Sequence, residues 1–267
     1  SATTNIIVNA LPIVNAGTYP AQCVSATTLA LVGSPMGGTF SGPGVSGNNF
    51  NASVAGTGSK TITYSYTDGN GCTNSATTSI TVNALPVVSA GSYPDQCFTS
   101  TMLTLTGSPL GGTFSGPGVT GNNFDASVAG VGMHTITYTY TNGNGCTNST
   151  TTTINVNALP VVNAGTYPAQ CVNATTLTLS GSPMGGTFSG PGVSGNNFNA
   201  SMAGTGMHTI TYSFTNGSGC SNSATTTITV NGLPVVNAGS YAAQCVSEST
   251  LTLVGSPMGG TFSGPGV

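Results

Sequence analysis

The sequence contains seven cysteines, which are its regularly spaced reactive side chains. They form two series, and within each series the cysteines are 74 residues apart. One series contains Cys23, Cys97, Cys171 and Cys245, and the other contains Cys72, Cys146 and Cys220. A zinc site would need clustered Cys or His ligands, and the sequence has no CxxC motif. The regular spacing instead indicates a disulfide framework formed in an oxidising compartment.

The string GGTFSGPGV also recurs, and its glycines raise the question of a phosphate-binding loop. It occupies residues 37–45, 111–119, 185–193 and 259–267. A P-loop needs a Lys and the N-terminus of a helix, and this string offers neither. We therefore predict a structural role, in which Gly37 and Gly38 allow a positive φ or close packing and Phe40 points inward. Residues 42–44 would turn the chain.

The acidic side chains and histidines do not form a catalytic set. The four acids occupy unrelated phases of the repeat: they are Asp68, Asp95, Asp125 and Glu248. Glycoside hydrolysis needs a facing pair of carboxylates, and calcium cages usually need several. His134 and His208 share a phase with Lys60, and we expect them at an exposed strand edge, because no acid would orient them. We therefore predict no catalysis, no cofactor and no metal site.

Charge is almost absent, since only 2% of the residues are charged and the formal net charge is -3. A basic patch for nucleic acid is therefore excluded. No apolar run approaches the roughly 20 residues that a membrane-spanning helix needs. The apolar residues make up 37% of the sequence and lie in short periodic runs, so disorder is not indicated either.

The repeat of 74 residues defines the domain organisation. NALP at 9–12 returns at 83 and 157, and as NGLP at 231. We predict the end of one repeat at 1–8, three repeats at 9–82, 83–156 and 157–230, and the first half of another at 231–267. Because the two partial repeats do not add up to a whole one, we expect the sequence to be a window from a longer array.

Within each repeat the pattern is β throughout. In TITYSYT (61–67) apolar side chains alternate with hydroxyl side chains, and TTSITV (77–82) has the same alternation. Between them lies DGNG (68–71), whose Asp-Gly and Asn-Gly pairs are typical of a tight hairpin turn. LPIV (11–14) and three other segments are expected to form further short strands; these are TLALVG (28–33), GTFSG (38–42) and NNFNAS (48–53). No window has helical periodicity. Six or seven strands in this length predict a small antiparallel, immunoglobulin-like β-sandwich. Its expected core comprises Leu29, Leu31, Phe40, Phe50, Ile62, Tyr64, Ile80 and Val82.

The chain resembles the immunoglobulin-like and PKD-like repeats of large secreted or surface proteins of the Bacteroidetes. The resemblance rests on the AG near the start of each repeat, the following Cys, GGTFSG, AGxG and ITYxYTxxNGC, and it covers essentially the whole chain. It implies export from the cell and a role in surface fibres, adhesins or stalks. It implies no active site, because such repeats are usually spacers.

Two disulfide connectivities remain open. Pairing within a repeat, Cys23 with Cys72, is slightly preferred, and it would close a loop of about 49 residues worth roughly 4 kcal/mol. In an immunoglobulin-like topology, however, these two cysteines lie toward opposite ends of the sandwich. The alternative joins neighbouring repeats, with Cys23 bonded to Cys146 and Cys97 bonded to Cys220.

Glycosylation is a hypothesis that follows from the uncharged surface. Glycans would keep such a surface from sticking, and their candidate acceptors are the sequon residues Asn51, Asn148, Asn173, Asn199 and Asn216 and the outward hydroxyls of Thr61, Thr63 and Thr77. The alternative is a bare hydroxyl surface stabilised by cross-strand Thr pairs.

The function predicted from the sequence is structural: stiffly linked β-sandwiches forming an extracellular or cell-surface filament or stalk. The expected partners are neighbouring repeats of the same or identical chains. An alternative is an adhesin whose repeats bind carbohydrate through exposed tyrosines, namely Tyr19, Tyr93, Tyr167 and Tyr241.

Overall fold

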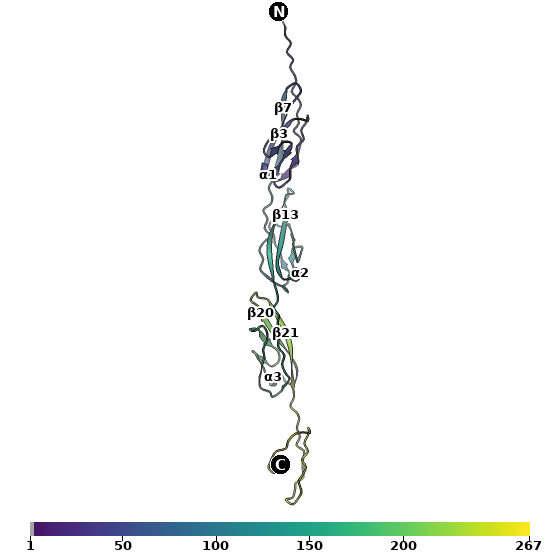
Figure 1. The fold of residues 1–267 in the computed structure, drawn as a ribbon, viewed down its shortest axis with the longest axis vertical. Coiled ribbons are helices and arrows are strands. Elements are labelled where there is room, and N and C mark those ends of the chain that lie inside the picture. The colour runs from purple at the N-terminus through teal and green to yellow at the C-terminus, as the bar shows by residue number, and fades with distance from the viewer. Residues whose placement is uncertain (1–2) are drawn as a thin grey trace. The chain divides into compact units, whose positions relative to one another are not determined.

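The computed structural model describes residues 3–267 and contains three sandwiches of the same architecture (Figure 1). The chain divides into two compact units after Val156. The first and second sandwiches belong to the N-terminal unit, and the third belongs to the C-terminal unit. The predicted tandem arrangement of similar β domains is confirmed.

The first sandwich consists of a four-stranded sheet in the order β1-β7-β6-β3 and a three-stranded sheet in the order β2-β5-β4. Its strands are β1 (Gln22–Cys23), β2 (Leu29–Ala30), β3 (Thr39–Ser41), β4 (Val45–Ser46), β5 (Asn49–Phe50), β6 (Gly58–Thr67) and β7 (Thr73–Asn83). Neighbouring strands pair antiparallel, except that β1 runs parallel to the end of β7. The sequence pattern predicted six or seven short strands in a sandwich, and the structure has seven strands in two sheets, two of them long: β6 has 10 residues and β7 has 11.

The second and third sandwiches repeat these sheets. The second contains β8 (Gln96–Cys97), β9 (Leu103–Thr104), β10 (Thr113–Ser115), β11 (Val119–Thr120), β12 (Asn123–Phe124), β13 (Gly132–Thr141) and β14 (Thr147–Asn157). The third contains β15 (Gln170–Cys171), β16 (Leu177–Thr178), β17 (Thr187–Ser189), β18 (Val193–Ser194), β19 (Asn197–Phe198), β20 (Gly206–Thr215) and β21 (Ser221–Asn231).

The long hairpin of β6 and β7 supplies the centre of the core, because its side chains alternate between the two faces of the sheet. On the inner face Ile62 and Ile80 are fully buried. On the outer face Thr63 lies opposite Thr77, so hydroxyl pairs line the solvent side of the hairpin. All the predicted core residues of this repeat are buried except Leu29, which is partly buried and packs against the others.

A one-turn helix follows the third strand of each small sheet and was not predicted: α1 (Ala52–Ala55), α2 (Ala126–Ala129) and α3 (Ala200–Ala203). Asn51 caps α1, since its side chain accepts hydrogen bonds from the N–H groups of Ser53 and Val54. The buried Ala52 anchors the turn to the core. A single turn is too short to show helical periodicity, so a local cap is its only sequence signal.

The glycine-rich string turns the chain and packs against β6, as expected. Gly37 has a φ of +99° and Gly44 one of +75°, both in the region that favours glycine. A Cβ on Gly38 would lie 2.6 Å from Cζ of Tyr64 and would also meet the carbonyl oxygen of Ser65. The Tyr64 hydroxyl accepts a hydrogen bond from the Gly38 N–H at 2.8 Å. This string is therefore a structural element of every sandwich.

The segment 11–14 does not form the strand that was expected of it. The nearby pairing is a single antiparallel bridge between Asn15 and Ser34. Pro12 lacks an N–H group for a strand ladder, which accounts for the failure of this prediction.

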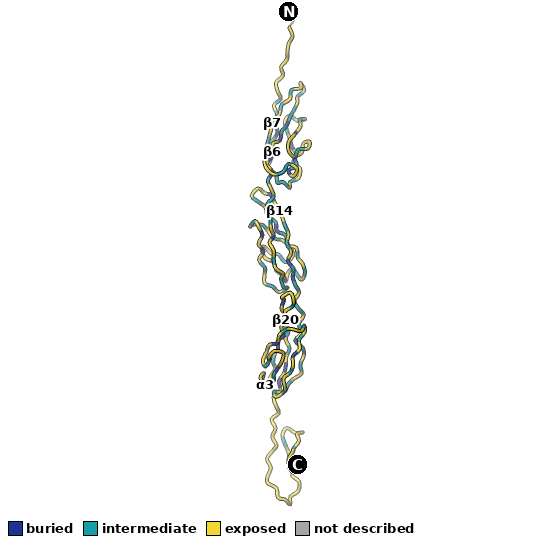
Figure 2. The backbone as a smooth tube through the Cα atoms, turned by 90° about the vertical axis from the view of Figure 1, so that its left-hand side faces the viewer, coloured by how far each residue is buried: buried dark blue, intermediate teal, exposed yellow. Residues whose placement is uncertain are grey.

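Residues 232–267 keep some contacts of a repeat but form no strand. The bridge between Asn237 and Ser256 is present, and the Tyr241 hydroxyl donates to the carbonyl oxygen of Val254 at 2.8 Å. Their side chains are mostly exposed, whereas buried residues lie inside each of the three sandwiches (Figure 2).

Candidate functional site, a covalent junction between repeats

The short strand β1 fixes the position of Cys23 at the far end of β7. In the parallel pair, Gln22 lies beside Val82 and Cys23 beside Asn83. The N–H of Val24 extends the pairing by donating to the carbonyl oxygen of Asn83 at 2.9 Å. Cys23 therefore lies where the first repeat ends and the chain passes into the second.

A tight turn between β13 and β14 fixes the position of Cys146. The N–H of Asn142 donates to the carbonyl oxygen of Cys146 at 3.0 Å, and the N–H of Cys146 donates back to Oδ1 of Asn142 at 3.0 Å. The same Oδ1 accepts from the N–H of Asn144. These local bonds hold the turn in one conformation, and Cys146 is fully buried.

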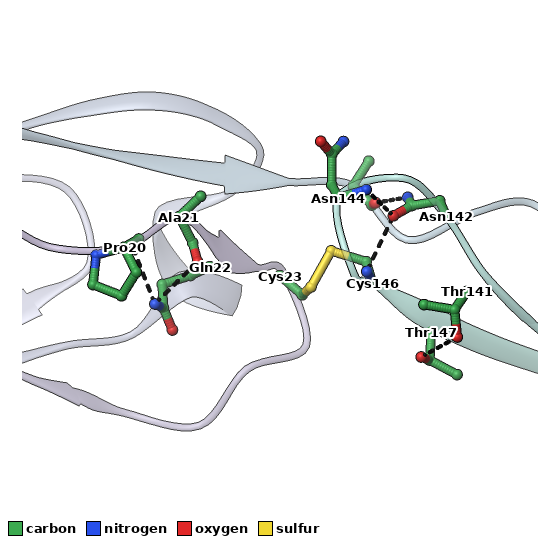
Figure 3. Close-up of a disulfide and its surroundings, with 10 residues drawn as sticks. Pro20, Ala21, Gln22, Cys23, Thr141, Asn142, Asn144, Cys146 and Thr147 are labelled. Carbon is green, nitrogen blue, oxygen red and sulfur yellow. Dashed lines mark hydrogen bonds between the residues drawn. A yellow bond between two sulfur atoms is a disulfide. The ribbon is translucent and has the colours of Figure 1, made fainter.

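Cys23 and Cys146 form a disulfide that joins the first repeat to the second (Figure 3). Their Cα atoms are 5.5 Å apart, within the usual range, although 123 residues separate them in the sequence. The covalent connection between these two repeats is therefore double, because it runs through both the backbone and the disulfide.

The preferred pairing of Cys23 with Cys72 is absent from the structure, and the topology explains why. Cys72 immediately precedes the start of β7, whereas Cys23 lies beside its last residue. A strand of 11 residues spans about 36 Å at ~3.3 Å per residue, and a disulfide tolerates a Cα separation of no more than about 7 Å. The alternative, Cys23 with Cys146, is the pairing that the structure contains.

The seven cysteines fall into two groups. We call Cys23, Cys97 and Cys171, each of which ends a short strand, and their counterpart Cys245 the strand cysteines; Cys72, Cys146 and Cys220 are the turn cysteines. Cys97 and Cys220 are also disulfide-bonded. Among the described residues, the free cysteines are the half-buried Cys72 and the exposed Cys171 and Cys245.

Two asparagine side chains reinforce the junction that the disulfide closes, and sequence reasoning missed both. Nδ2 of Asn142, in the turn of the second repeat, donates to the carbonyl oxygen of Ala84 at 3.3 Å. Nδ2 of Asn148 donates to the carbonyl oxygen of Pro86 at 2.9 Å. The hairpin of the second repeat is thus tied to the segment that enters it. The NGNGCTN motif supplies both donors, so their regular spacing was the available signal.

The first repeat lacks one of these bonds. Nδ2 of Asn74 donates to the carbonyl oxygen of Pro12 at 2.8 Å, as its counterpart Asn148 does to that of Pro86. Asp68 stands in place of Asn142, and its carboxylate has no N–H to donate. Oδ1 of Asp68 still accepts from the N–H of Cys72 at 2.9 Å, so the turn itself is retained.

The asparagines predicted as glycan acceptors differ in whether their side chains already make hydrogen bonds within the protein. Oδ1 of Asn51 and of Asn199 caps a helix, and Asn173 is exposed. Nδ2 of Asn148 and Nδ2 of Asn216 donate to backbone carbonyls, and a glycan on either nitrogen would remove a donor hydrogen. Among the Thr acceptors, Thr61 and Thr77 are exposed and Thr63 is half-buried. Glycosylation stays a prediction.

The tyrosines suggested for carbohydrate binding are structural in the three sandwiches. The Tyr19 hydroxyl donates to the carbonyl oxygen of Ala16 at 2.9 Å and accepts from the N–H of Val32 at 2.9 Å. Tyr93 and Tyr167 make equivalent bonds, and all three side chains pack against the core. Tyr241 is 40% exposed. The expectation of exposed ring surfaces was wrong for the first three, because one of the two partners of each hydroxyl lies 13 residues away in the sequence and is brought near only by folding.

Three titratable side chains, those of His134, His208 and Asp125, make hydrogen bonds to the nearby backbone. His134 and His208 are half-buried, and Nε2 of each contacts a backbone carbonyl oxygen at 2.8 Å, so they are not the exposed edge residues expected. Hydrogen bonds from the hydroxyl and N–H of Ser127, and from the N–H of Val128, lower the pKa of Asp125 below its ordinary value of 3.8. Within residues 3–267, no cluster of three His, Cys, Asp or Glu residues could hold a metal ion.

These sandwiches and their junction define the class of protein: an all-β tandem array of immunoglobulin-like domains. No protein-family model matches the sequence, and no curated protein matches it. Among the described residues, no helix has the length and apolar character to cross a bilayer.

The solved structures that match this chain include an adhesin, a protocadherin and a glucan-locus protein. A Ca2+-stabilized adhesin with which an Antarctic bacterium binds ice is 16% identical, with a TM-score of 0.33 over 85% of this chain and 78% of that chain. Mouse protocadherin-24 EC1-3 is 14% identical, with a TM-score of 0.26 over 84% of this chain and 100% of that chain. The Bacteroides ovatus glucan-locus protein SGBP-B, in complex with a mixed-linkage heptasaccharide, is 16% identical, with a TM-score of 0.21 over 91% of this chain and 75% of that chain. Scores this low carry no conclusion about ligands or partners.

Proposed function

We propose that this chain is a structural segment of an extracellular stalk or filament, in which neighbouring immunoglobulin-like repeats are joined by disulfides and transmit tension. The observation that carries the proposal is the bond between Cys23 and Cys146, which connects two repeats rather than two strands of one. A disulfide in this position restricts how the repeats move relative to each other.

The chemistry of the surface supports the same role. With 2% charged residues the chain offers little for electrostatic recognition, and its long hairpins present paired hydroxyls to solvent. Disulfides are typical of proteins outside the reducing cytosol, which supports an extracellular location. The proposed role involves no catalysis, and the partners are neighbouring repeats of the same or identical chains.

Single-molecule pulling on the whole chain tests the proposal. In the oxidised chain the force passes through the disulfide, so the 123 residues between Cys23 and Cys146 cannot be stretched. Each of these residues adds ~3.4 Å when the reduced chain unfolds. The increase in end-to-end length on unfolding should therefore be at least about 400 Å smaller for the oxidised chain than for the reduced chain. Equal released lengths in the two redox states would contradict a role in bearing tension. A glycan array, in which a pure spacer binds nothing, separates this function from that of a carbohydrate-binding adhesin.

A further inference from the structure

All seven methionines of the sequence lie on the surface of the structure. Methionine is one of the residue types that folded proteins most often bury, so this distribution is unusual. Even the least exposed of them, Met102, has an exposed fraction of 65%. The exposed methionines are Met36, Met102, Met133, Met184, Met202, Met207 and Met258. The first six belong to the repeats that form the three sandwiches.

The sandwich forms in the same way with or without a thioether at these positions. Leu110 takes the place of Met36 and Met184, and it is exposed as they are. The exposed Ser59 takes the place of Met133. Because all three repeats have the same sheets, the fold accepts an apolar or a polar side chain here. Packing therefore does not explain why these residues are methionines.

The oxidisable side chains that hold the fold together are shielded from solvent. Cys146 of the disulfide is fully buried, and Tyr138 in the core of the same repeat is 2% exposed. The Tyr138 hydroxyl donates to the carbonyl oxygen of Pro109 and accepts from the N–H of Gly112 at 2.9 Å. The equivalent tyrosines of the other two sandwiches are buried to the same extent. An oxidant from solvent therefore meets the methionine sulfurs before it meets these groups.

The position of a methionine decides what its oxidation does to a protein. Methionine sulfoxide is polar, so it disrupts packing where the side chain lies in a core. On an exposed side chain the added oxygen is solvated and no core contact is lost. Within the described residues, the three hydrophobic core clusters contain no methionine. Each of the six methionines in the sandwiches can therefore be oxidised with little effect on stability.

We propose that the exposed methionines form a sacrificial oxidation site, which consumes hypochlorous acid at the surface before it reaches the core tyrosines and the bond between Cys23 and Cys146. The chain has no Trp, one Lys or Arg and two His, so it offers this oxidant few other accessible side chains. A protein outside the cytosol meets oxidants without a pool of reducing thiols around it. The inference goes beyond the proposed function and holds whether or not the repeats bear tension.

The reaction transfers one oxygen atom to each sulfur. The soft thioether sulfur attacks the chlorine of hypochlorous acid and displaces hydroxide, which leaves a chlorosulfonium ion. Water then adds to the sulfur, chloride leaves, and loss of two protons gives the sulfoxide. The sulfur thus loses two electrons, and the chlorine gains them to become chloride.

The test titrates the whole chain with hypochlorous acid after all free thiols have been blocked with a maleimide. Intact mass counts the oxygen atoms taken up, and peptide mapping locates them. We expect up to seven oxygen atoms, all on methionine, before a core tyrosine is chlorinated or the bond between Cys23 and Cys146 is lost. The melting temperature should fall by less than about 4 °C when every methionine is oxidised, because the changes lie at the surface.

The matched variant replaces all seven methionines with leucine, the residue already present at Leu110. Treated with seven equivalents of oxidant, it should show at least five-fold more chlorinated tyrosine and oxidised disulfide than the natural chain. Its melting temperature before treatment shows that it is folded. If it does not fold, the double variant Met36→Leu with Met184→Leu replaces it, and this variant should take up two oxygen atoms fewer than the natural chain.

Three results would overturn the inference: oxidation of core tyrosines or of the disulfide while most methionines are unmodified, a larger fall in melting temperature on methionine oxidation, or equal damage to the natural chain and the leucine variant. The untreated chain reports separately on the proposed function. If the bond between Cys23 and Cys146 is present there but is not protected, this inference fails alone. If that bond is absent from the untreated chain, the proposed function fails.

Discussion

Nδ2 of Asn148 donates to the carbonyl oxygen of Pro86 at 2.9 Å and ties the second hairpin to the segment that leads into it. The disulfide at Cys146 lies two residues earlier in the same hairpin. One local element thus supplies a covalent and a hydrogen-bonded contact to the junction. Duplication of a repeat therefore also duplicates the cysteine and the asparagine that join it to the preceding repeat.

Removing the disulfide should destabilise the two repeats that it joins. The double variant Cys23→Ser with Cys146→Ser loses a cross-link across 123 residues, and we expect the free energy of unfolding to fall by about 2–5 kcal/mol. Equilibrium denaturation monitored by tyrosine fluorescence measures the change.

The matched control for this experiment is Cys72→Ser with Cys171→Ser, which changes the same two phases where no bond is present. It should shift the free energy by less than about 0.5 kcal/mol in the monomer. Equal effects of the two double variants would show that the loss arises from the cysteine positions and not from the bond.

Asn142→Asp should remove the donor to Ala84 while keeping the turn, because Asp68 keeps the turn in the first repeat. The expected cost is about 0.5–1.5 kcal/mol in the free energy of unfolding. The reverse change, Asp68→Asn, introduces the missing donor and should stabilise the first repeat. Denaturation measures the free energy of unfolding of both variants. A change of the same sign in both would count against a stabilising role of the hydrogen bond from Asn142 to Ala84.

Asp125 should make the stability of the second repeat depend on pH in the acid range. Hydrogen bonds to its carboxylate lower its pKa in the folded chain, so the folded state binds this proton less readily than the unfolded state. Its stabilisation is present above the ordinary value of 3.8 and is lost as the pH falls through the lowered folded pKa.

Asp125→Asn is the matched control, because Asn51 and Asn199 form the equivalent cap without titrating. Melting temperatures measured from pH 7 to pH 2 should decline more steeply for the natural chain than for the variant. Parallel curves would exclude a contribution from this carboxyl group.

Gly38→Ala should destabilise the first sandwich by about 1–3 kcal/mol, because the new Cβ meets Tyr64 and the backbone of Ser65. Gly69→Ala, where a Cβ has no neighbour within 4 Å, should change stability by less than about 0.5 kcal/mol. Thermal unfolding of the two variants compares them. An unaffected Gly38→Ala would mean that the string is not a close-packing element.

The parts of the fold that follow from local alternation could be predicted from the sequence. Ile62 and Ile80 alternate with hydroxyl side chains along the hairpin, and this pattern alone assigns them to the core. The one-turn helix at Ala52 could not be assigned in this way, because four residues cannot display a period of 3.6.

The disulfide at the junction was harder to predict, because the distances between cysteines depend on how the strands are arranged in the sheet and not on their separation in the sequence. Pairing of Cys23 with Cys72 is the shorter loop, but the parallel pairing of β1 with β7 places these residues at opposite ends of an 11-residue strand. The role of Tyr19 depends on Val32, which only the folded chain brings near. The pairing found, Cys23 with Cys146, was the alternative that the immunoglobulin-like topology had left open.

The most direct test of the account is peptide mapping of the unreduced chain after free thiols are blocked. The account predicts a linked pair of peptides containing Cys23 and Cys146, with Cys72 found as a blocked thiol in the monomer. A linked pair containing Cys23 and Cys72 would contradict it, because the repeats would then be closed individually and nothing covalent beyond the backbone would join them.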